Sequence, residues 1–349
     1  MVNHLGNWRN GELGNFITLK RGFDLPQQKR EDGQVPIFSS SGITGTHSTA
    51  MVNAPGVITG RYGTIGEVFY AAEDFWPLNT TLFVEDFHGN DAKFIYYFLK
   101  TLEWSKFTSA SAVPGINRNT VHKETVSLPD IETQRRIAST LSMLDEKIKT
   151  NTEINDNLQQ QAQAIYSSMF IDNPDPAWSH GHLSDLITVK YGKDHKKLAD
   201  GIYPVYGSGG IMRYVERPLY NKESVLIPRK GTLNNVMYVN QPFWSVDTMF
   251  YTEMKLPNVA KFVYHFVKAK DLASMNAGSA VPSMTTDILN AMEVVIPSAS
   301  ALEEFESLVA PMYEAMEAND VQSKALSQMR DTLLPKLMSG EIDVSDIQL

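Results

Sequence analysis

Basic, amide and hydroxyl side chains gather in two separate sets of short segments that also contain glycine. Arg and Lys can hydrogen-bond to guanine, Asn and Gln to adenine, and Ser, Thr and Lys to phosphates of a nucleic-acid backbone. The first set comprises Lys20, Arg21, Ser40, Arg61, Tyr62, Thr64, Asn117 and Arg118. The second set comprises Lys190, Lys193, His195, Lys196, Lys197, Ser208, Arg229, Lys230, Thr232 and Asn234. Their composition fits DNA readout, and we treat all of them as candidate DNA-binding residues.

For Arg61 and Arg229, a structural role within the fold is as good an explanation as contact with DNA. They occupy the same position in two similar stretches, Arg61-Tyr-Gly-Thr64 and Arg229-Lys-Gly-Thr232. Shared residues serve a common fold more readily than they read two different sequences, so internal hydrogen bonding and phosphate contact both stay open for them. Base discrimination is expected where the copies diverge, chiefly in residues 21–34 against 191–202 and 62–68 against 230–236. That ranking favours Lys193, His195, Lys196, Lys197, Lys230 and Asn234.

The sequence contains no recognisable catalytic or metal-binding motif. It lacks a G-x-x-x-x-G-K-[ST] phosphate loop, an H-E-x-x-H zinc motif and a G-x-S-x-G nucleophile elbow. It has no cysteine, which excludes disulfides, thiolate zinc sites and iron–sulfur ligation. His180 and His182 alone are a weak metal signal, and we expect solvated turn residues there. We therefore predict no catalytic residue and no metal site in this chain.

The two sets of polar segments belong to a tandem duplication. The matched pairs, at an offset of 170 and then of 168, include Trp8 with Trp178, Leu13 with Leu183, Arg61 with Arg229, and Lys93 with Lys261. An offset held over so many matches indicates two copies of one domain. The aromatic residues that follow Lys93 and Lys261 are expected in the cores, with both lysines solvated.

Each copy begins with short strands and ends in one long helix. About 120 residues rich in Gly, Ser, Thr, Val and aromatics, with short alternating runs, predict strands and turns. From Glu132 to Phe170 there is no Gly or Pro, and apolar residues recur at heptad spacing. This spacing predicts a helix of about 38 residues. A second helix with the same apolar seam is expected from Phe305 to Leu337, with a kink at Pro311.

A long helix with one apolar stripe needs a partner, and the simplest partner is the helix of the other copy. A pseudo-twofold relation would make the pair antiparallel. Asn151 and Asn319 occupy equivalent seam positions, where we expect them to meet and fix the register; the alternative is that each faces solvent. The predicted fold class is α+β, with two pseudo-symmetric α/β domains separated by two long antiparallel, coiled-coil-like helices. The expected boundaries are 1–130 and 173–298 for the domains, and 131–172 and 299–349 for the helices.

The composition points to a cytoplasmic protein with two cores. The chain has 349 residues, of which 42% are hydrophobic, and this is ample for two domains. No run approaches the roughly 18 apolar residues of a membrane span, and no apolar stretch typical of a signal peptide begins the sequence. The net charge of −9 argues against DNA binding on average, but residues 299–349 hold 3 basic and 10 acidic residues, hence 7 of the 9 excess negatives. The remainder is near neutral, which leaves room for a local basic face.

Five phrases of the sequence, taken together, are typical of one known family. They are Pro36-Ile-Phe-Ser-Ser-Ser-Gly42, Val57-Ile-Thr-Gly-Arg-Tyr-Gly-Thr-Ile-Gly66, Pro129-Asp-Ile-Glu-Thr-Gln-Arg-Arg-Ile-Ala138, Pro204-Val-Tyr-Gly-Ser-Gly-Gly210 and Leu333-Leu-Pro-Lys-Leu-Met-Ser-Gly-Glu-Ile342. With the order domain, long helix, domain, long helix, the chain resembles the specificity (S) subunit of type I restriction-modification systems over almost its whole length.

The resemblance implies that the domains are target recognition domains, each reading one half of a split double-stranded DNA site. The helices would set the spacing of the half-sites and bind two modification subunits, and restriction subunits could join them. The modification subunits would carry S-adenosylmethionine and the adenine methyltransferase activity, and ATP and Mg would act on other partner subunits. This chain would bind no cofactor and catalyse nothing. The second copy departs from the family pattern at Leu302-Glu-Glu-Phe305 and Pro311, so the two modification subunits could dock unequally.

Two other classes of function stay open at this point. A non-catalytic two-headed scaffold that binds proteins or glycans would share the architecture but would not affect DNA methylation. An enzyme with a site in the head loops would turn over S-adenosylmethionine and DNA without a partner.

Overall fold

The computed structural model describes residues 8–108, 115–275 and 283–344. The chain divides into two compact units: unit 1 is Met1–Asn151 with Asp320–Leu349, and unit 2 is Thr152–Asn319. The long helices α3 (Ile131–Ser167) and α7 (Ala299–Met338) each contribute one half to each unit. Each unit therefore consists of a head, made of small sheets and short helices, and two helix halves that support it.

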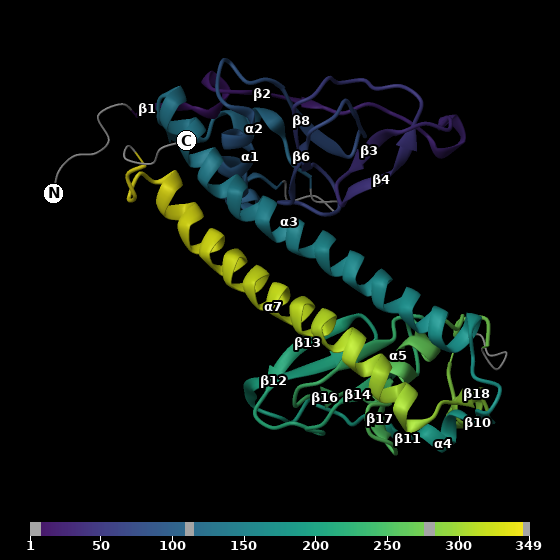
Figure 1. Cartoon of the computed structure of the whole chain (residues 1–349). Helices are drawn as coiled ribbons and strands as arrows, with labels where there is room; N and C mark the ends of the chain where they lie inside the picture. The colour runs from purple at the N-terminus through teal and green to yellow at the C-terminus, as the bar shows by residue number, and fades with distance from the viewer. Residues whose placement is uncertain (1–7, 109–114, 276–282, 345–349) are drawn as a thin grey trace. The chain divides into compact units, whose positions relative to one another are not determined.

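The head of unit 1 contains three small sheets. Its strands are β1 (Arg9–Glu12), β2 (Thr18–Arg21), β3 (Val35–Ser39), β4 (Gly42–His47), β5 (Gly56–Gly60), β6 (Val68–Ala71), β7 (Trp76–Pro77), β8 (Thr81–Asp86) and β9 (Thr125–Leu128). Its short helices are α1 (Ala92–Lys100) and α2 (Arg118–His122), with 3-10 turns at Leu13–Asn15, Gln27–Lys29 and Trp104–Phe107. The sheet orders are β2-β8-β5-β6, β4-β3-β7 and β1-β9. Figure 1 labels β1, β2, β3, β4, β6 and β8 of this head.

The head of unit 2 repeats this topology. Its strands are β10 (Ser179–His182), β11 (Ile187–Tyr191), β12 (Asp200–Gly207), β13 (Gly210–Val215), β14 (Ser224–Pro228), β15 (Met237–Val239), β16 (Trp244–Ser245), β17 (Met249–Met254) and β18 (Glu293–Ile296). Its helices are α4 (Leu183–Leu186), α5 (Ala260–Lys268) and α6 (Thr286–Asn290). The sheet orders, β11-β17-β14-β15, β13-β12-β16 and β10-β18, match those of unit 1 strand for strand. The predicted duplication is thus confirmed.

The central strands form because β-branched and apolar residues are buried on both faces there. In β5, Ile58 pairs with Phe69 on one side and with Phe83 on the other, and every residue of the strand is buried. Helix α1 begins where the Asp91 carboxylate accepts a hydrogen bond from the N–H of Phe94 at 2.8 Å, a standard N-cap. The aromatic face of α1 then packs into the core, as its sequence predicts.

The long helices are held to the heads by their seam residues. In unit 1 the core includes Ile137 and Leu141 of α3 and Leu337 of α7. In unit 2 it includes Tyr166 of α3 and Phe305 of α7. Burial of these apolar side chains, worth about 1.5–3 kcal/mol each, anchors each helix half to its head. After Ser167, α3 ends in a π-helical turn, Ser168–Asp172, and α7 continues through Pro311 as one helix.

Within each unit the two helix halves run antiparallel. In unit 1, Asp145 of α3 pairs with Arg330 at 2.7 Å, while Asn151, further along α3, donates to Gln322, which lies earlier in α7. In unit 2, Asn155 donates to the carbonyl oxygen of Met316 at 3.1 Å. The predicted antiparallel arrangement is confirmed in each unit. Over the described ranges, no helix has both the length and the apolar character needed to cross a membrane.

Candidate nucleic-acid interface

In unit 1 the segments that carry the predicted polar residues meet at one end of the four-stranded sheet. The N–H of Arg61, just after β5, donates to the Thr80 carbonyl at 2.8 Å, and the Arg61 carbonyl accepts from the N–H of Ile116 at 3.0 Å. The N–H of Gly22, just after β2, donates to the Thr81 carbonyl at 3.1 Å. These backbone bonds hold three chain segments side by side. We call the group loop cluster 1; it consists of residues 20–24, 60–66, 78–81 and 115–118.

The turn between β3 and β4 joins this cluster through Ser40. A Cβ atom on Gly63 would lie 3.2 Å from the Ser40 hydroxyl, and Gly63 has a φ of +77°, which favours glycine. The Arg61 guanidinium lies over the Tyr62 ring, 4.5 Å from its centroid, and Tyr62 forms an isolated β-bridge with Gly115. The fold therefore brings the predicted residues Ser40, Arg61, Tyr62 and Thr64 together.

Asn117 and Arg118 also reach loop cluster 1 because they follow Ile116. Asn117 caps α2, with its side-chain oxygen accepting from the N–H of Asn119 at 3.0 Å. Arg118 is exposed, and among the residues described it forms no ion pair. Burial, followed by the charge of Arg118, lowers the pKa of His122, whose Nε2 accepts a hydrogen bond from the N–H of Leu19. Arg118 is thus the cation of this cluster most available to a phosphate.

The two basic residues on β2 already have acidic neighbours. Lys20 forms an ion pair with Glu85, and Arg21 lies 3.8 Å from Asp24. All four side chains are substantially exposed, so each pair contributes little stability and can exchange partners. Both residues remain predictions for DNA contact, with part of their charge compensated.

In unit 2 the same backbone frame recurs at equivalent positions. The N–H of Arg229 donates to the Thr248 carbonyl at 2.9 Å, and its carbonyl accepts from the N–H of Met284 at 2.9 Å. The offset of 168 relates each of these atoms to its counterpart around Arg61. The backbones of Arg61 and Arg229 therefore serve the common fold, whereas phosphate contact by their guanidinium groups stays a prediction. We call residues 190–197, 208, 228–235, 245–249 and 283–284 loop cluster 2.

Ser208, Lys230 and Thr232 lie together in loop cluster 2. The Ser208 carbonyl accepts a hydrogen bond from the Asn235 amide at 2.8 Å, and Lys230 forms a β-bridge with Ser283. Between Lys230 and Thr232, Gly231 has a φ of +85°, and a Cβ there would lie 2.6 Å from the Ser208 hydroxyl. Glycine is therefore required for this close approach, as it is at Gly63.

Loop cluster 2 carries more uncompensated positive charge than loop cluster 1. The N–H of Lys193 donates to the Ser245 carbonyl at 2.8 Å, which ties the segment 193–197 to the sheet. Lys190 pairs with Glu253 at 3.6 Å, and His195 is half-buried. Within loop cluster 2, four exposed lysines form no ion pair with any residue that the structure describes: Lys193, Lys196, Lys197 and Lys230.

An aromatic side chain lies beside this charge. The Arg229 guanidinium lies 5.5 Å from the centroid of the Tyr191 ring, and its Nη1 donates to the Asp247 carbonyl at 3.2 Å. Tyr191 itself is exposed. An exposed ring held by an arginine can stack against a base or sugar while the cation faces phosphate.

The side chain of Asn234 is hydrogen-bonded to other residues of unit 2. Its Nδ2 donates to Asp271 Oδ1 at 3.0 Å, and its Oδ1 accepts from the N–H of Ala273 at 3.0 Å. The first bond is the main reason why the pKa of Asp271 is lowered. A DNA base would have to replace one of these bonds, so Asn234 ranks below the four unpaired lysines.

The expectation that Lys261 is solvated is wrong. Its side chain is 7% exposed and pairs with Glu306 at 2.6 Å and with Glu223 at 3.3 Å. The sequence match with Lys93 concealed this difference, because both carboxylates come from other elements. Lys93 in unit 1 is half-buried and lies over the Tyr70 ring at 4.1 Å.

Asn151 and Asn319 both contact the facing helix within their own units. Asn151 is buried and donates to Gln322 Oε1 at 2.9 Å and to Ser323 Oγ at 3.1 Å. Asn319 donates to Asn155 Oδ1 at 2.8 Å. The solvent-facing alternative is therefore wrong for Asn151, and the predicted contact between Asn151 and Asn319 stays a prediction.

The exposed apolar residues on the hairpin of β12 and β13 are not among those predicted from the sequence. Ile211, Met212 and Tyr214 are exposed just beyond the turn that contains Ser208. In the equivalent hairpin of unit 1, Thr44 and Thr46 replace Met212 and Tyr214. The available signal was the pair Ile211-Met212, since alternation in a strand with one solvent face predicts a polar residue at one of the two.

The arrangement supplies hydrogen-bond donors, cations and exposed rings. In the described part of the chain, no group of three or more His, Cys, Asp or Glu residues could hold a metal ion. Groups of these kinds are suited to hydrogen bonds and ion pairs with an anionic polymer that has polar base edges.

The comparisons with known proteins agree with this assignment. The model of the family described as "Type I restriction modification DNA specificity domain" matches residues 6–160 and 177–305, one match for each copy. The type I restriction enzyme MjaIX specificity subunit of Methanocaldococcus jannaschii is 24% identical over 307 residues, covering 74% of this chain and 71% of its own. The type I restriction enzyme HindI specificity subunit of Haemophilus influenzae is 22% identical and covers 70% and 75%.

A solved structure has the same fold. The crystal structure of a type I restriction-modification system S subunit from M. genitalium superimposes with a TM-score of 0.67, covering 97% of each chain at 20% identity. Because the family model covers more than half of the sequence, membership does not depend on these weaker identities. This chain belongs to the type I restriction modification DNA specificity domain family.

Proposed function

We propose that this chain is the non-catalytic DNA-recognition subunit of a type I restriction-modification complex, with each head reading one half of a bipartite double-stranded target. The observation that carries the proposal is the duplicated backbone frame, in which Arg61 and Arg229 make the same two hydrogen bonds. On that frame the side chains differ: Tyr62 stands where Lys230 stands in the second copy. A constant backbone frame with different side chains suits two domains that recognise different DNA sequences.

The two loop clusters differ in the number of exposed cations that could contact phosphates. In loop cluster 2 the exposed Lys193, Lys196 and Lys197 are available for phosphate contact, and Tyr191 beside Arg229 offers a stacking surface. Loop cluster 1 has fewer uncompensated cations, with Arg118 as its main one. We infer that the second head contributes more of the salt-dependent affinity.

The long helices are the proposed partner surface. We infer that α3 and α7 set the spacing of the half-sites and dock two modification subunits, which hold S-adenosylmethionine and methylate adenine. Restriction subunits that use ATP and Mg could join the complex, and this chain would bind none of these cofactors. The acidic character of residues 299–349 supports protein docking over DNA contact at α7. No comparison supports the scaffold for proteins or glycans.

Methylation-sensitive sequencing of host DNA tests the proposal directly. With the coding sequence intact we expect a split methyladenine motif, and deletion should remove it. Replacing residues 178–298 by another recognition domain should change one half-site and leave the other half-site and the spacing. An insertion within 150–157 should lengthen the spacing alone. Unchanged methylation in a deletion strain, with the partner expressed in the parent, contradicts the proposal.

A further inference from the structure

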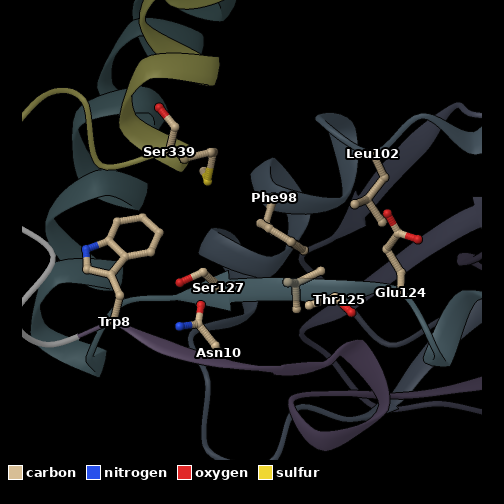
Figure 2. Close-up of a pocket in the computed structure, with 10 residues that line it drawn as sticks. Trp8, Asn10, Phe98, Leu102, Glu124, Thr125, Ser127 and Ser339 are labelled. Atoms are coloured by element: carbon tan, nitrogen blue, oxygen red, sulfur yellow. The ribbon is translucent and has the colours of Figure 1, made fainter.

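Unit 1 contains a pocket that belongs to neither loop cluster. It has a volume of about 400 Å³ and lies between the β1–β9 strand pair, the end of α1 and the last residues of α7 (Figure 2). Its apolar walls are Trp8, Phe98, Leu102 and Met338. This volume falls in the range of small-molecule sites, which combine apolar walls with a few placed polar groups.

The polar groups of the pocket give it a negative character. Glu124 is the one formal charge among the ten lining residues, and Trp8 and Glu124 lie at opposite ends of the pocket in Figure 2. Within the described ranges Glu124 forms no ion pair, since nearby Lys106 pairs with Glu103 at 2.7 Å instead. The side chains of Asn10 and Ser127 add neutral hydrogen-bonding groups between the two ends.

The equivalent place in unit 2 is filled. Phe170 stands at the position of Met338, is 4% exposed, and lies 5.6 Å from the Trp178 ring, the counterpart of Trp8. Met292 stands at the position of Glu124 and is 5% exposed in the same core. The π-helical turn Ser168–Asp172 places Phe170 there, whereas α7 reaches Met338 as an ordinary α-helix.

The charge of the site is also reversed between the copies. Lys270 in unit 2 replaces Leu102, and its ammonium lies 4.6 Å from the centroid of the Phe266 ring. Unit 2 thus places its own cation on the aromatic wall that Phe98 forms in unit 1, and it has no carboxylate at the position of Glu124. Unit 2 thus has a buried phenylalanine and a buried methionine where unit 1 has Met338 and Glu124, so the duplicated topology does not by itself require an acidic residue at this place.

From this contrast we propose that the pocket of unit 1 binds an organic ammonium ion with an aromatic or aliphatic body. The body lies between Trp8 and Phe98, and the ammonium group forms a charge-assisted hydrogen bond with Glu124. Asn10 and Ser127 lie toward Trp8 in Figure 2, so they can hydrogen-bond to a polar atom of the ligand body, such as an indole N–H. The proposal stands independently of DNA recognition, because no lining residue is part of either loop cluster.

Calorimetric titration of the full chain with three indole probes tests the charge preference. Tryptamine carries an ammonium group, tryptophol is its neutral analogue, and indole-3-acetate is an anion of similar size. We expect saturable binding of tryptamine to one site per chain, affinity about tenfold weaker for tryptophol, and no binding of indole-3-acetate. The absence of saturable tryptamine binding, or equal binding of all three probes, overturns the proposal.

Two variants locate the binding. Glu124→Gln should weaken tryptamine binding about tenfold, whereas Glu73→Gln, at an exposed carboxylate outside the pocket, should leave it unchanged. The double variant Glu124→Met with Met338→Phe copies the filled site of unit 2 and should abolish binding with no loss of thermal stability. If the double variant does not fold, Glu124→Gln still decides: unchanged tryptamine affinity in that variant overturns the proposal.

Discussion

Asn319 donates a hydrogen bond from Nδ2 to Oδ1 of Asn155 at 2.8 Å, between the two long helices in unit 2. In unit 1, Asn151 donates to Oγ of Ser323 at 3.1 Å. The offset of 168 maps Asn151 onto Asn319 and Asn155 onto Ser323, so one contact is made twice, once in each unit. A polar contact in a mostly apolar seam disfavours slipped pairings, which would leave its members without partners.

Single and double replacements of Asn155 and Asn319 should therefore differ in how much they lower the free energy of unfolding. Asn319→Leu leaves the Asn155 amide without this partner and should lower the free energy of unfolding by about 1–3 kcal/mol. Asn155→Leu together with Asn319→Leu replaces the polar contact by an apolar pair, so most of the lost stability should be recovered. Urea unfolding of the full chain measures both. Asn157→Leu, at an exposed position of α3, is the control, and equal losses in the single and double variants contradict the interpretation.

Lys261 is the centre of a buried ionic network in unit 2. Its ammonium pairs with Glu306 and Glu223, and the Tyr238 and Tyr313 rings lie 5.1 and 5.5 Å away. Lys261→Met would leave two partly buried carboxylates without their cation and should destabilise the protein by about 3 kcal/mol. Thermal and urea unfolding measure this loss.

The duplication supplies a matched control for this prediction. Lys93 occupies the equivalent position in unit 1, lies over Tyr70, and has no ion pair in the described part of the chain. Lys93→Met should therefore cost less than about 1 kcal/mol. Similar losses in the two variants would mean that stacking on the tyrosine ring, and not the carboxylates, stabilises Lys261.

Features set by local pattern could be predicted from the sequence. The heptad spacing after Glu132 predicts α3 because helix periodicity depends only on neighbouring residues. Repeated phrases around Arg61 and Arg229 predict one shared fold, and their backbones do make equivalent hydrogen bonds. The fold class and the antiparallel pairing followed from these two signals.

Side-chain surroundings that depend on distant segments could not be predicted. Lys261 is buried because Glu306, 45 residues later, reaches it from α7. Asn234 is engaged because Asp271, 37 residues later, lies beside it. The difference between the sites at Trp8 and at Trp178 could not be predicted either, because distant helices supply the neighbouring side chains. Met338 comes from α7, and Phe170 comes from the end of α3. A repeat alignment shows that such positions differ but not what each one touches.

His265 should make the stability of the protein depend on pH. The ring is fully buried; in its neutral form Nδ1 donates to Gln163 Oε1 at 2.8 Å and Nε2 accepts from the Tyr313 hydroxyl at 2.9 Å. Burial lowers the pKa of His265 from 6.5 to about 4. The unfolded chain therefore binds a proton at a higher pH than the folded chain, so stability falls as the pH drops from 6.5 to 4, by about 3 kcal/mol.

The variant His265→Gln isolates this contribution because glutamine does not titrate. Urea unfolding between pH 7 and pH 4 should show a smaller loss of stability in the variant than in the natural sequence, with the difference confined to pH values below about 6.5. His180→Gln, at an exposed histidine of the same unit, should leave the pH dependence unchanged. Parallel pH profiles for the natural sequence and His265→Gln would rule out a buried neutral His265.

DNA affinity should depend on the modification subunit as well as on this chain. The net charge of −9 provides little general attraction for phosphate, and the local cations are few. The isolated chain should bind a specific duplex poorly at physiological salt, and adding the modification subunit should raise the affinity strongly. Fluorescence anisotropy with a labelled duplex measures both states. Tight specific binding by the chain alone contradicts this expectation.

Within that complex, the double variant Lys196→Ala with Lys197→Ala should reveal what the second head contacts. If both lysines contact phosphates, affinity falls for all duplexes, and the slope of log affinity against log salt decreases by about 0.9 for each lysine. If they read bases, the variant instead relaxes the sequence preference at one half-site only. Lys222→Ala is the control. Lys222 is an exposed lysine just before β14, whereas Arg229 of loop cluster 2 lies just after the opposite end of that strand. Equal effects of the double variant and Lys222→Ala would mean that loop cluster 2 is not the DNA-contacting surface.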